Sequence, residues 1–224
     1  MAEPGRSGTT TAPRAGADVA RRAAGSAAAG CALAGAVAVT VAVVAGPGPG
    51  FSGYVSESGI AGGAQAATYR IGILALAAAL LLIGAALPPG VWAAAPALLA
   101  TGAVFTAVSG AVTCSAGCPL PPFERATNAD LVHGGASIAA TASVVFAMLT
   151  LAVSGPAGPA VRRLAGVTAA LALPLCATAG LAMLVVGRGA VVGVLERLVL
   201  VLLVVWGLAT ATVLALDRRP ARRL

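Results

Sequence analysis

The residues of this chain with the clearest chemical potential are Asp130 and His133, which is the only histidine. Their spacing of three residues places both side chains on one face of a helix. A carboxylate and an imidazole placed in this way can ligate a metal ion or act as an acid and base pair, completed by Glu57 or Glu196. A catalytic zinc site commonly uses more than one histidine. We therefore favour a structural role, in which Asp130 caps the helix and fixes the tautomer of His133, and we expect no metal and no cofactor.

Other ionisable residues lie between or beside long apolar stretches, and we expect them to meet in one polar cluster. Charges held close to lipid are costly unless they are paired, so the ends of distant segments gain by meeting. The predicted binding residues are Glu57, Arg125, Asp130, His133, Glu196 and Arg197. Within this cluster we expect Glu57 to pair with Arg125 or Arg197. If the protein is an enzyme, the catalytic candidates are Asp130, His133, Glu57 and Glu196.

The four cysteines fall into two groups. Cys114 and Cys118 are separated by three small residues in a segment that we place outside the cytoplasm, where thiols are oxidised, so they are predicted to form a disulfide. Free thiols or a redox-active or metal-binding pair are the alternatives. Cys31 and Cys176 lie in apolar stretches and are interpreted as small packing residues.

The elements that position these residues are predicted to be membrane-spanning helices. Hydrophobic residues make up 59% of the chain and charged residues 9%, which is far from the composition of a soluble globular protein. A hydrocarbon core about 30 Å thick requires roughly 20 apolar residues, and lipid cannot satisfy open backbone groups. Six stretches meet this requirement, at 23–45, 71–87, 91–112, 131–153, 164–186 and 198–216.

The predicted fold is therefore all-α, a polytopic membrane protein built as a six-helix transmembrane bundle. Residues 1–22 are predicted to be a disordered cytoplasmic tail, because they offer hardly any apolar side chain to bury. Residues 23–216 form the six-span domain, and residues 217–224 form a basic cytoplasmic tail.

The distribution of arginine predicts the orientation, since basic residues beside spans are retained in the cytoplasm. The chain has 14 basic residues, all arginine, and a net charge of +7. Ten of them flank the spans on one side: Arg6, Arg14, Arg21, Arg22, Arg162, Arg163, Arg218, Arg219, Arg222 and Arg223. Both termini are therefore predicted to be cytoplasmic in a multi-pass protein of the cell membrane, with this face in contact with anionic lipid. Nucleic-acid binding is not expected, because no aromatic residues are interleaved with the arginines.

Short sequence features suggest how the helices pack. The run Pro88, Pro89, Gly90 predicts a tight turn between the second and third spans, and Pro174 predicts a kink in the fifth. Small residues four apart allow helices in lipid to approach closely. Three such seams are found, at Gly102, Thr106 and Gly110, at Gly135, Ala139 and Ser143, and at Ala172, Cys176 and Gly180.

Several short motifs in a fixed order resemble those of one family. They are the stretch from Tyr54 to Gly59 after the first span, Asp130, His133 and Gly134 at the mouth of the fourth, and Glu196 and Arg197 at the mouth of the sixth. In their order and in their placement relative to the spans, they resemble the bacterial membrane family catalogued as domain of unknown function 998. The resemblance covers roughly residues 25–216. It implies a polytopic membrane protein without an established activity.

Three classes of function are compatible with these features. The favoured one is a non-catalytic membrane protein that senses, scaffolds, or binds a lipid or partner through its outer loops. The alternatives are an outer-face enzyme acting on a lipid or envelope precursor, and a small-molecule transporter. Transport is disfavoured because no ionisable residue lies in the middle of a predicted span. The sequence does not define an oligomeric state.

Overall fold

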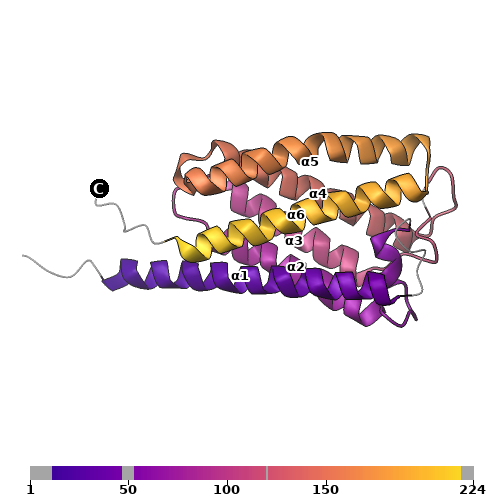
Figure 1. Ribbon diagram of the computed structural model, residues 1–224, viewed down its shortest axis with the longest axis horizontal. Coiled ribbons are helices and arrows are strands. Elements are labelled where there is room, and N and C mark those ends of the chain that lie inside the picture. The colour runs from indigo at the N-terminus through magenta and orange to yellow at the C-terminus, as the bar shows by residue number, and fades with distance from the viewer. Residues whose placement is uncertain (1–11, 47–52, 120, 218–224) are drawn as a thin grey trace, which may run out of the picture.

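The computed structural model describes residues 12–46, 53–119 and 121–217. Within these ranges the chain forms long α-helices and two short 3₁₀ helices, and contains no strand (Figure 1). The long helices are α1 (Ala12–Ala45), α2 (Ala66–Ala86), α3 (Ala94–Ala111), α4 (Asn128–Val153), α5 (Pro159–Val185) and α6 (Ala190–Leu216). All six are long and apolar enough to cross a membrane. The predicted all-α architecture with six spans is confirmed.

The helices form a closed ring. Each helix packs against its neighbours in the sequence, and α6 packs against α1 to complete the ring. The connections α1–α2, α3–α4 and α5–α6 lie at one end, which we call the polar end (Figure 1). The start of α1, the end of α6 and the connections α2–α3 and α4–α5 lie at the other, which we call the arginine-rich end.

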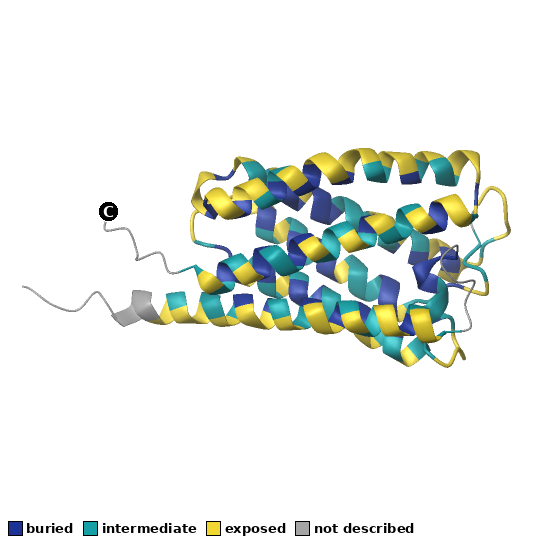
Figure 2. Cartoon of the chain, viewed as in Figure 1, coloured by how far each residue is buried: buried dark blue, intermediate teal, exposed yellow. Residues whose placement is uncertain are grey.

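Exposed residues line the outside of the bundle along its length (Figure 2), and many of them are large and hydrophobic. Large hydrophobic side chains project outward from every long helix, among them Ile138, Leu171 and Val201, which are 64%, 55% and 60% exposed. Such a surface would be unfavourable in water but is the one that lipid requires.

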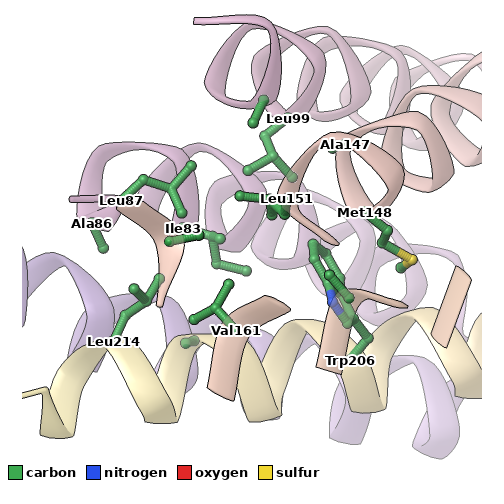
Figure 3. Packing of buried hydrophobic residues seen from close by; sticks show 14 of the residues in the cluster. Ile83, Ala86, Leu87, Leu99, Ala147, Met148, Leu151, Val161, Trp206 and Leu214 are labelled. Atoms are coloured by element: carbon green, nitrogen blue, oxygen red, sulfur yellow. The ribbon is translucent and has the colours of Figure 1, made fainter. Parts of the chain in front are cut away.

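The largest side chains of the interior gather toward the arginine-rich end. Ile83, Leu99, Met148, Leu151 and Trp206 are fully buried there and pack together between the helices (Figure 3). They come from α2, α3, α4 and α6, so one cluster joins most of the ring. At the polar end a smaller buried cluster of Ala42, Val55, Tyr69 and Ile73 packs beside the connecting segments, and the candidate site lies there.

The helix ends agree with the sequence prediction within one residue, whereas the helix starts differ, most of all those of α1 and α6. α1 begins at Ala12, within the segment predicted to be disordered, and Asp18 forms an ion pair with Arg21 across one helical turn at 2.5 Å. This segment is rich in alanine, the best helix former, so it extends the helix without a core to pack on. Residues 1–11 lie outside the described part of the chain.

The second difference concerns α6, which begins at Ala190 rather than at residue 198. Glu196 and Arg197 therefore lie inside the helix and not in a loop at 187–197. Both side chains form hydrogen bonds to the α1–α2 connection, as described below. These bonds explain why charged residues can lie inside an apolar helix.

Candidate functional site

Glu196 and Arg197 attach the α1–α2 connection to α6. The amide of Val55 donates a hydrogen bond of 3.0 Å to Oε2 of Glu196. The Arg197 guanidinium donates to the carbonyls of Gly53 and, at 3.1 Å, Gly193. The two residues are adjacent in the sequence, yet both reach backbone groups of the same connection. Their charges are thus used to fix backbone that would otherwise be poorly satisfied at a lipid boundary.

Tyr54 begins the short helix η2 (Val55–Gly59) and is 9% exposed. Its amide donates to Oε1 of Glu57 at 3.2 Å. Its hydroxyl oxygen is buried and has no hydrogen-bond partner among the described residues. Burial, and next the negative charge of Glu196, raise the pKa of Tyr54 to about 12. The hydroxyl therefore stays protonated and can donate a hydrogen bond to an incoming group.

The last residue of η2, Gly59, allows this short helix to pack closely against α2. A Cβ atom at Gly59 would stand only 2.4 Å from Cδ1 of the Tyr69 ring, which is 4% exposed. No larger side chain fits this contact. Gly59 and Tyr69 thus hold the segment that carries Tyr54 and Glu57 in a fixed position.

On the opposite side of the polar end, Asp130 organises the α3–α4 connection. Its carboxylate accepts hydrogen bonds from the amide of Ser115 at 2.6 Å and the Ser115 hydroxyl at 3.0 Å. It also accepts from the amide of Thr127 at 2.8 Å, while Thr127 Oγ1 accepts from the Asp130 amide at 3.3 Å. This reciprocal pair is a capping box, and it agrees with the expectation that Asp130 caps the helix.

His133 has different partners from those expected. Its Nδ1 lies 2.9 Å from the carbonyl oxygens of Ser109 and Val112, near the end of α3. A carbonyl can only accept, so Nδ1 carries the hydrogen and the backbone of α3, rather than Asp130, fixes the tautomer. His133 is 6% exposed and connects α4 to α3.

The structure joins Cys114 and Cys118 by a disulfide, with Cα atoms 5.0 Å apart. The small loop that it closes contacts both sides of the polar end. Ser56 Oγ of η2 lies 3.4 Å from Cys118 Sγ. Gly117, between the cysteines, packs against the guanidinium of Arg188. A Cβ atom at Gly117 would stand 2.4 Å from Nη1 of that arginine. The loop thus supports a cationic side chain from the α5–α6 connection.

A polar cavity of about 300 Å³ opens between these elements. It is lined by Gly53, Tyr54, Glu57, Glu124, Arg188, Gly189 and Ala190. Arg188 Nη1 and Glu124 Oε1 are 3.8 Å apart, a distance that leaves the guanidinium able to accommodate another acceptor. The cavity therefore combines two carboxylates, one guanidinium and the side chain of Tyr54, whose hydroxyl is buried.

The first turn of α6 adds backbone donors to the cavity. In the described structure its N-cap, Gly189, supplies no side-chain hydrogen bond, and the first turn contains no acidic residue. The first amides of a helix have no partner within the helix, and together with the helix dipole they favour a negatively charged group.

The six predicted binding residues are distributed over these elements in different roles. Glu57 lines the cavity, and Glu196 and Arg197 hold the segment that carries it. Asp130 and His133 hold the α3–α4 connection, whereas Arg125 is exposed. Their action as a single cluster stays a prediction. Among the described residues, no three His, Cys, Asp or Glu side chains are grouped to hold a metal ion.

Three cavity residues were missed by the sequence interpretation, namely Tyr54, Glu124 and Arg188. All three lie in connecting segments that the sequence places at one end of the bundle. The opposite charges of Glu124 and Arg188 could have indicated in the sequence that these two side chains lie near each other. The sequence gives no such indication for the unsatisfied hydroxyl of Tyr54, because burial of a loop tyrosine depends on the tertiary fold.

The six apolar helices and the exposed apolar girdle define a polytopic membrane protein with a polar cavity at one end. The chain belongs to the family described as protein of unknown function (DUF998), which matches residues 26–213. No curated protein and no solved structure matches it.

Proposed function

We propose that this protein is a non-catalytic binding protein of the cell membrane, and that its polar cavity holds a zwitterionic head group. The observation that carries the proposal is the convergence of Glu57, Glu124, Arg188 and Tyr54 around one cavity, beside which the Tyr54 hydroxyl is buried without a partner among the described residues. A buried polar group without a partner is costly, and a ligand that supplies the partner removes the cost.

The charges of the cavity indicate a ligand that carries both signs. Arg188, the Tyr54 hydroxyl and the first turn of α6 are donors, which suit a phosphate group. Glu57 and Glu124 suit an ammonium group, and they leave the lining with more negative than positive side chains. A phosphate alone would be repelled by these carboxylates. A phosphate joined to an ammonium group satisfies both halves.

The orientation that we propose places this cavity at the outer face. Arg21, Arg22, Arg162 and Arg163 lie at the arginine-rich end, and the positive-inside rule assigns that end to the cytoplasm. There the arginines can contact anionic lipid. The cavity is then accessible to the head groups of the outer leaflet.

The contacts of the histidine and aspartate support binding over catalysis. Asp130 and His133 do not line the cavity, and their hydrogen bonds go to Ser115, Thr127 and the backbone of α3. A catalytic acid or base must reach its substrate, which these two do not do in this arrangement. Against transport, the apolar cluster of Figure 3 fills the bundle toward the arginine-rich end.

Calorimetric titration of the detergent-solubilised protein tests the proposal, with phosphoethanolamine as the probe. We expect phosphoethanolamine to bind more tightly than ethanolamine or inorganic phosphate. Arg188→Gln and Glu57→Gln should each weaken binding by about 10-fold or more, because each removes an interaction with a charged partner worth about 1.5 to 3 kcal/mol. Glutamine at position 57 retains an oxygen that can accept from the Tyr54 amide.

Two further variants control this experiment. Arg163→Gln removes an exposed arginine at the opposite end and should leave binding unchanged. Tyr54→Phe removes only the unpartnered hydroxyl and should also weaken binding. Equal affinity for phosphate alone, or equal losses in Arg163→Gln and Arg188→Gln, would refute the zwitterionic site.

A further inference from the structure

An apolar groove lies between α5 and α6, farther along these helices from the polar end than the polar cavity. Its volume is about 590 Å³, and it is lined by Leu171, Pro174, Leu175, Thr178, Leu198, Val201, Leu202 and Val205. Leu171 and Leu198 are 55% and 50% exposed, so the groove opens on the surface that faces lipid. Figure 1 shows α5 and α6 running side by side along this length.

The polar side-chain group that lines the groove already has a hydrogen-bond partner. Its one hydroxyl, that of Thr178, donates to the carbonyl of Pro174 within α5 at 2.8 Å. Pro174 has no amide hydrogen to expose. The chemistry of the groove therefore suits a hydrocarbon chain.

The groove and the polar cavity lie on the same side of α6. Ala190 lines the cavity, and positions 194, 198, 201 and 205 follow it at the helical repeat, so all five project from one stripe. Val194, between the two sites, is 46% exposed and apolar. Arg197 stands at the edge of this stripe, but its guanidinium donates to the carbonyls of Gly53 and Gly193, so the exposed positions between the two sites are apolar.

The depth of the groove fits one leaflet. At a rise of 1.5 Å per residue, Leu198 lies about 12 Å and Val205 about 22 Å along the helix from Ala190. Ala190 lines the cavity proposed for the head group, and half of a bilayer about 40 to 45 Å thick including its head groups is about 20 to 22 Å. A lipid whose head group occupies the cavity would have its acyl chain at the level of the groove.

We infer that the ligand is an intact bilayer phospholipid with an ammonium-bearing head group, whose phosphate and ammonium occupy the polar cavity while one acyl chain runs along α6 into the α5–α6 groove. This inference rests on the proposed function and extends it by naming the lipid. A partner helix fits the groove less well, because helices in lipid meet through small residues and this groove is lined mainly by leucine and valine.

The experiment compares a phosphatidylethanolamine with soluble phosphoethanolamine on the same purified protein. Lipid binding is measured by native mass spectrometry, and head-group binding by calorimetry. Val201→Trp fills the groove, and we expect it to lower lipid affinity by about tenfold, the size of a modest overpacking clash. It should leave the affinity for phosphoethanolamine unchanged. Arg188→Gln should weaken both ligands.

Matched variants keep the result interpretable. Leu171→Trp fills the groove from α5 and should reproduce the effect of Val201→Trp. Val167→Trp adds the same side chain at an exposed position of α5 outside the groove and should have no effect. Retained phosphoethanolamine binding in each variant shows that the protein is folded. A phosphatidylethanolamine with a photoreactive group in its acyl chain should crosslink to α5 or α6.

The possible failures can be told apart. If phosphoethanolamine does not bind, the proposed function fails, and the lipid inference fails with it. If phosphoethanolamine binds but the groove variants leave lipid affinity unchanged, or crosslinks map to other helices, the lipid inference is overturned and the proposed function stands. A third outcome is that the unsubstituted protein forms a dimer, which Val201→Trp abolishes without weakening lipid binding. This would assign the groove to a second copy of the chain and would also overturn the lipid inference.

Discussion

At the scale of single residues, the polar groups of this protein divide between structure and binding. Asp130 has the residue type and spacing of a catalytic group, but its contacts are those of a helix cap and a loop anchor. Tyr54, with no noticeable motif, lines the cavity and carries a buried hydroxyl without a partner among the described residues. Hydrogen-bond partners separate the two roles, because a carboxylate that already accepts several bonds has little capacity left for a ligand.

Replacing Asp130 with alanine tests its structural role. Asp130→Ala leaves the amides of Ser115 and Thr127 without their acceptor. We expect the free energy of unfolding to fall by about 1 to 3 kcal/mol, the cost of buried donors left unsatisfied. Unfolding in a titration with SDS measures this loss. Asn128→Ala, at an exposed neighbouring position of α4, should change stability little. A stable Asp130→Ala protein that has lost ligand binding would instead place Asp130 in the site.

At the scale of helices, close approaches between small residues set the packing, and only part of them follows the predicted seams. Gly102 packs on α4, where a Cβ atom would stand 3.1 Å from Val144, and Gly110 packs on Ile73 of α2. No atom of another element lies within 4 Å of a Cβ placed at Gly135 or Gly180, so the second and third seams were wrong at these glycines. In a chain rich in alanine and glycine, spacing alone does not identify the contact face.

The close crossing of α1 and α2 was not predicted. A Cβ atom at Gly35 of α1 would stand 2.8 Å from the carbonyl oxygen of Gly72 on α2, and one at Gly72 would stand 3.0 Å from the carbonyl oxygen of Gly35. The two backbones therefore touch, as small residues permit in lipid. This crossing aligns α1 with α2 and so places both ends of the segment that carries Tyr54.

Substitution of Gly35 tests the importance of this crossing. Gly35→Ala forces the backbones of α1 and α2 apart, and we expect a loss of about 1 to 3 kcal/mol in unfolding free energy. Gly30→Ala, on the same helix but with open space around it, should be neutral or gain up to about 1 kcal/mol from helix propensity. Thermal unfolding in detergent compares the pair. Equal stability of the two variants would show that the crossing contributes nothing.

At the scale of the whole molecule, the alternation of six helices makes the two ends chemically different. The start of α1 and the end of α6 lie at the same end, as an even number of spans requires. The arginines are concentrated there, and the carboxylates of the cavity lie at the other end. Under the positive-inside rule this asymmetry supports the proposed orientation, with the arginine-rich end in the cytoplasm.

Labelling of introduced cysteines tests that orientation. The background chain carries Cys31→Ala and Cys176→Ala, while Cys114 and Cys118 stay paired and unreactive. Ala61→Cys lies in the α1–α2 connection and Gly155→Cys in the α4–α5 connection, both at exposed positions. In intact cells an impermeant maleimide should label position 61 and spare position 155. Labelling of position 155 alone would invert the proposed topology, and labelling of both would contradict the six-span threading.

The sequence by itself determined the class of the protein, the number of spans and, within one residue, where their helices end. These depend on local properties, because a run of about 20 apolar residues is driven into lipid whatever lies elsewhere in the chain. It also predicted that Asp130 caps α4, since capping involves residues within one turn.

Only the tertiary structure decided which of these residues share a site. Glu57 had two equivalent arginine partners in the sequence, yet in the structure its carboxylate accepts from the Tyr54 amide and lines a cavity with Glu124 and Arg188. His133 was assigned to Asp130 because the two are close in sequence, but it bonds to the backbone of α3. The physical reason is that such partners are chosen by the closing of the helix ring, which brings together segments more than 100 residues apart, as the bond between Val55 and Glu196 does across 141 positions.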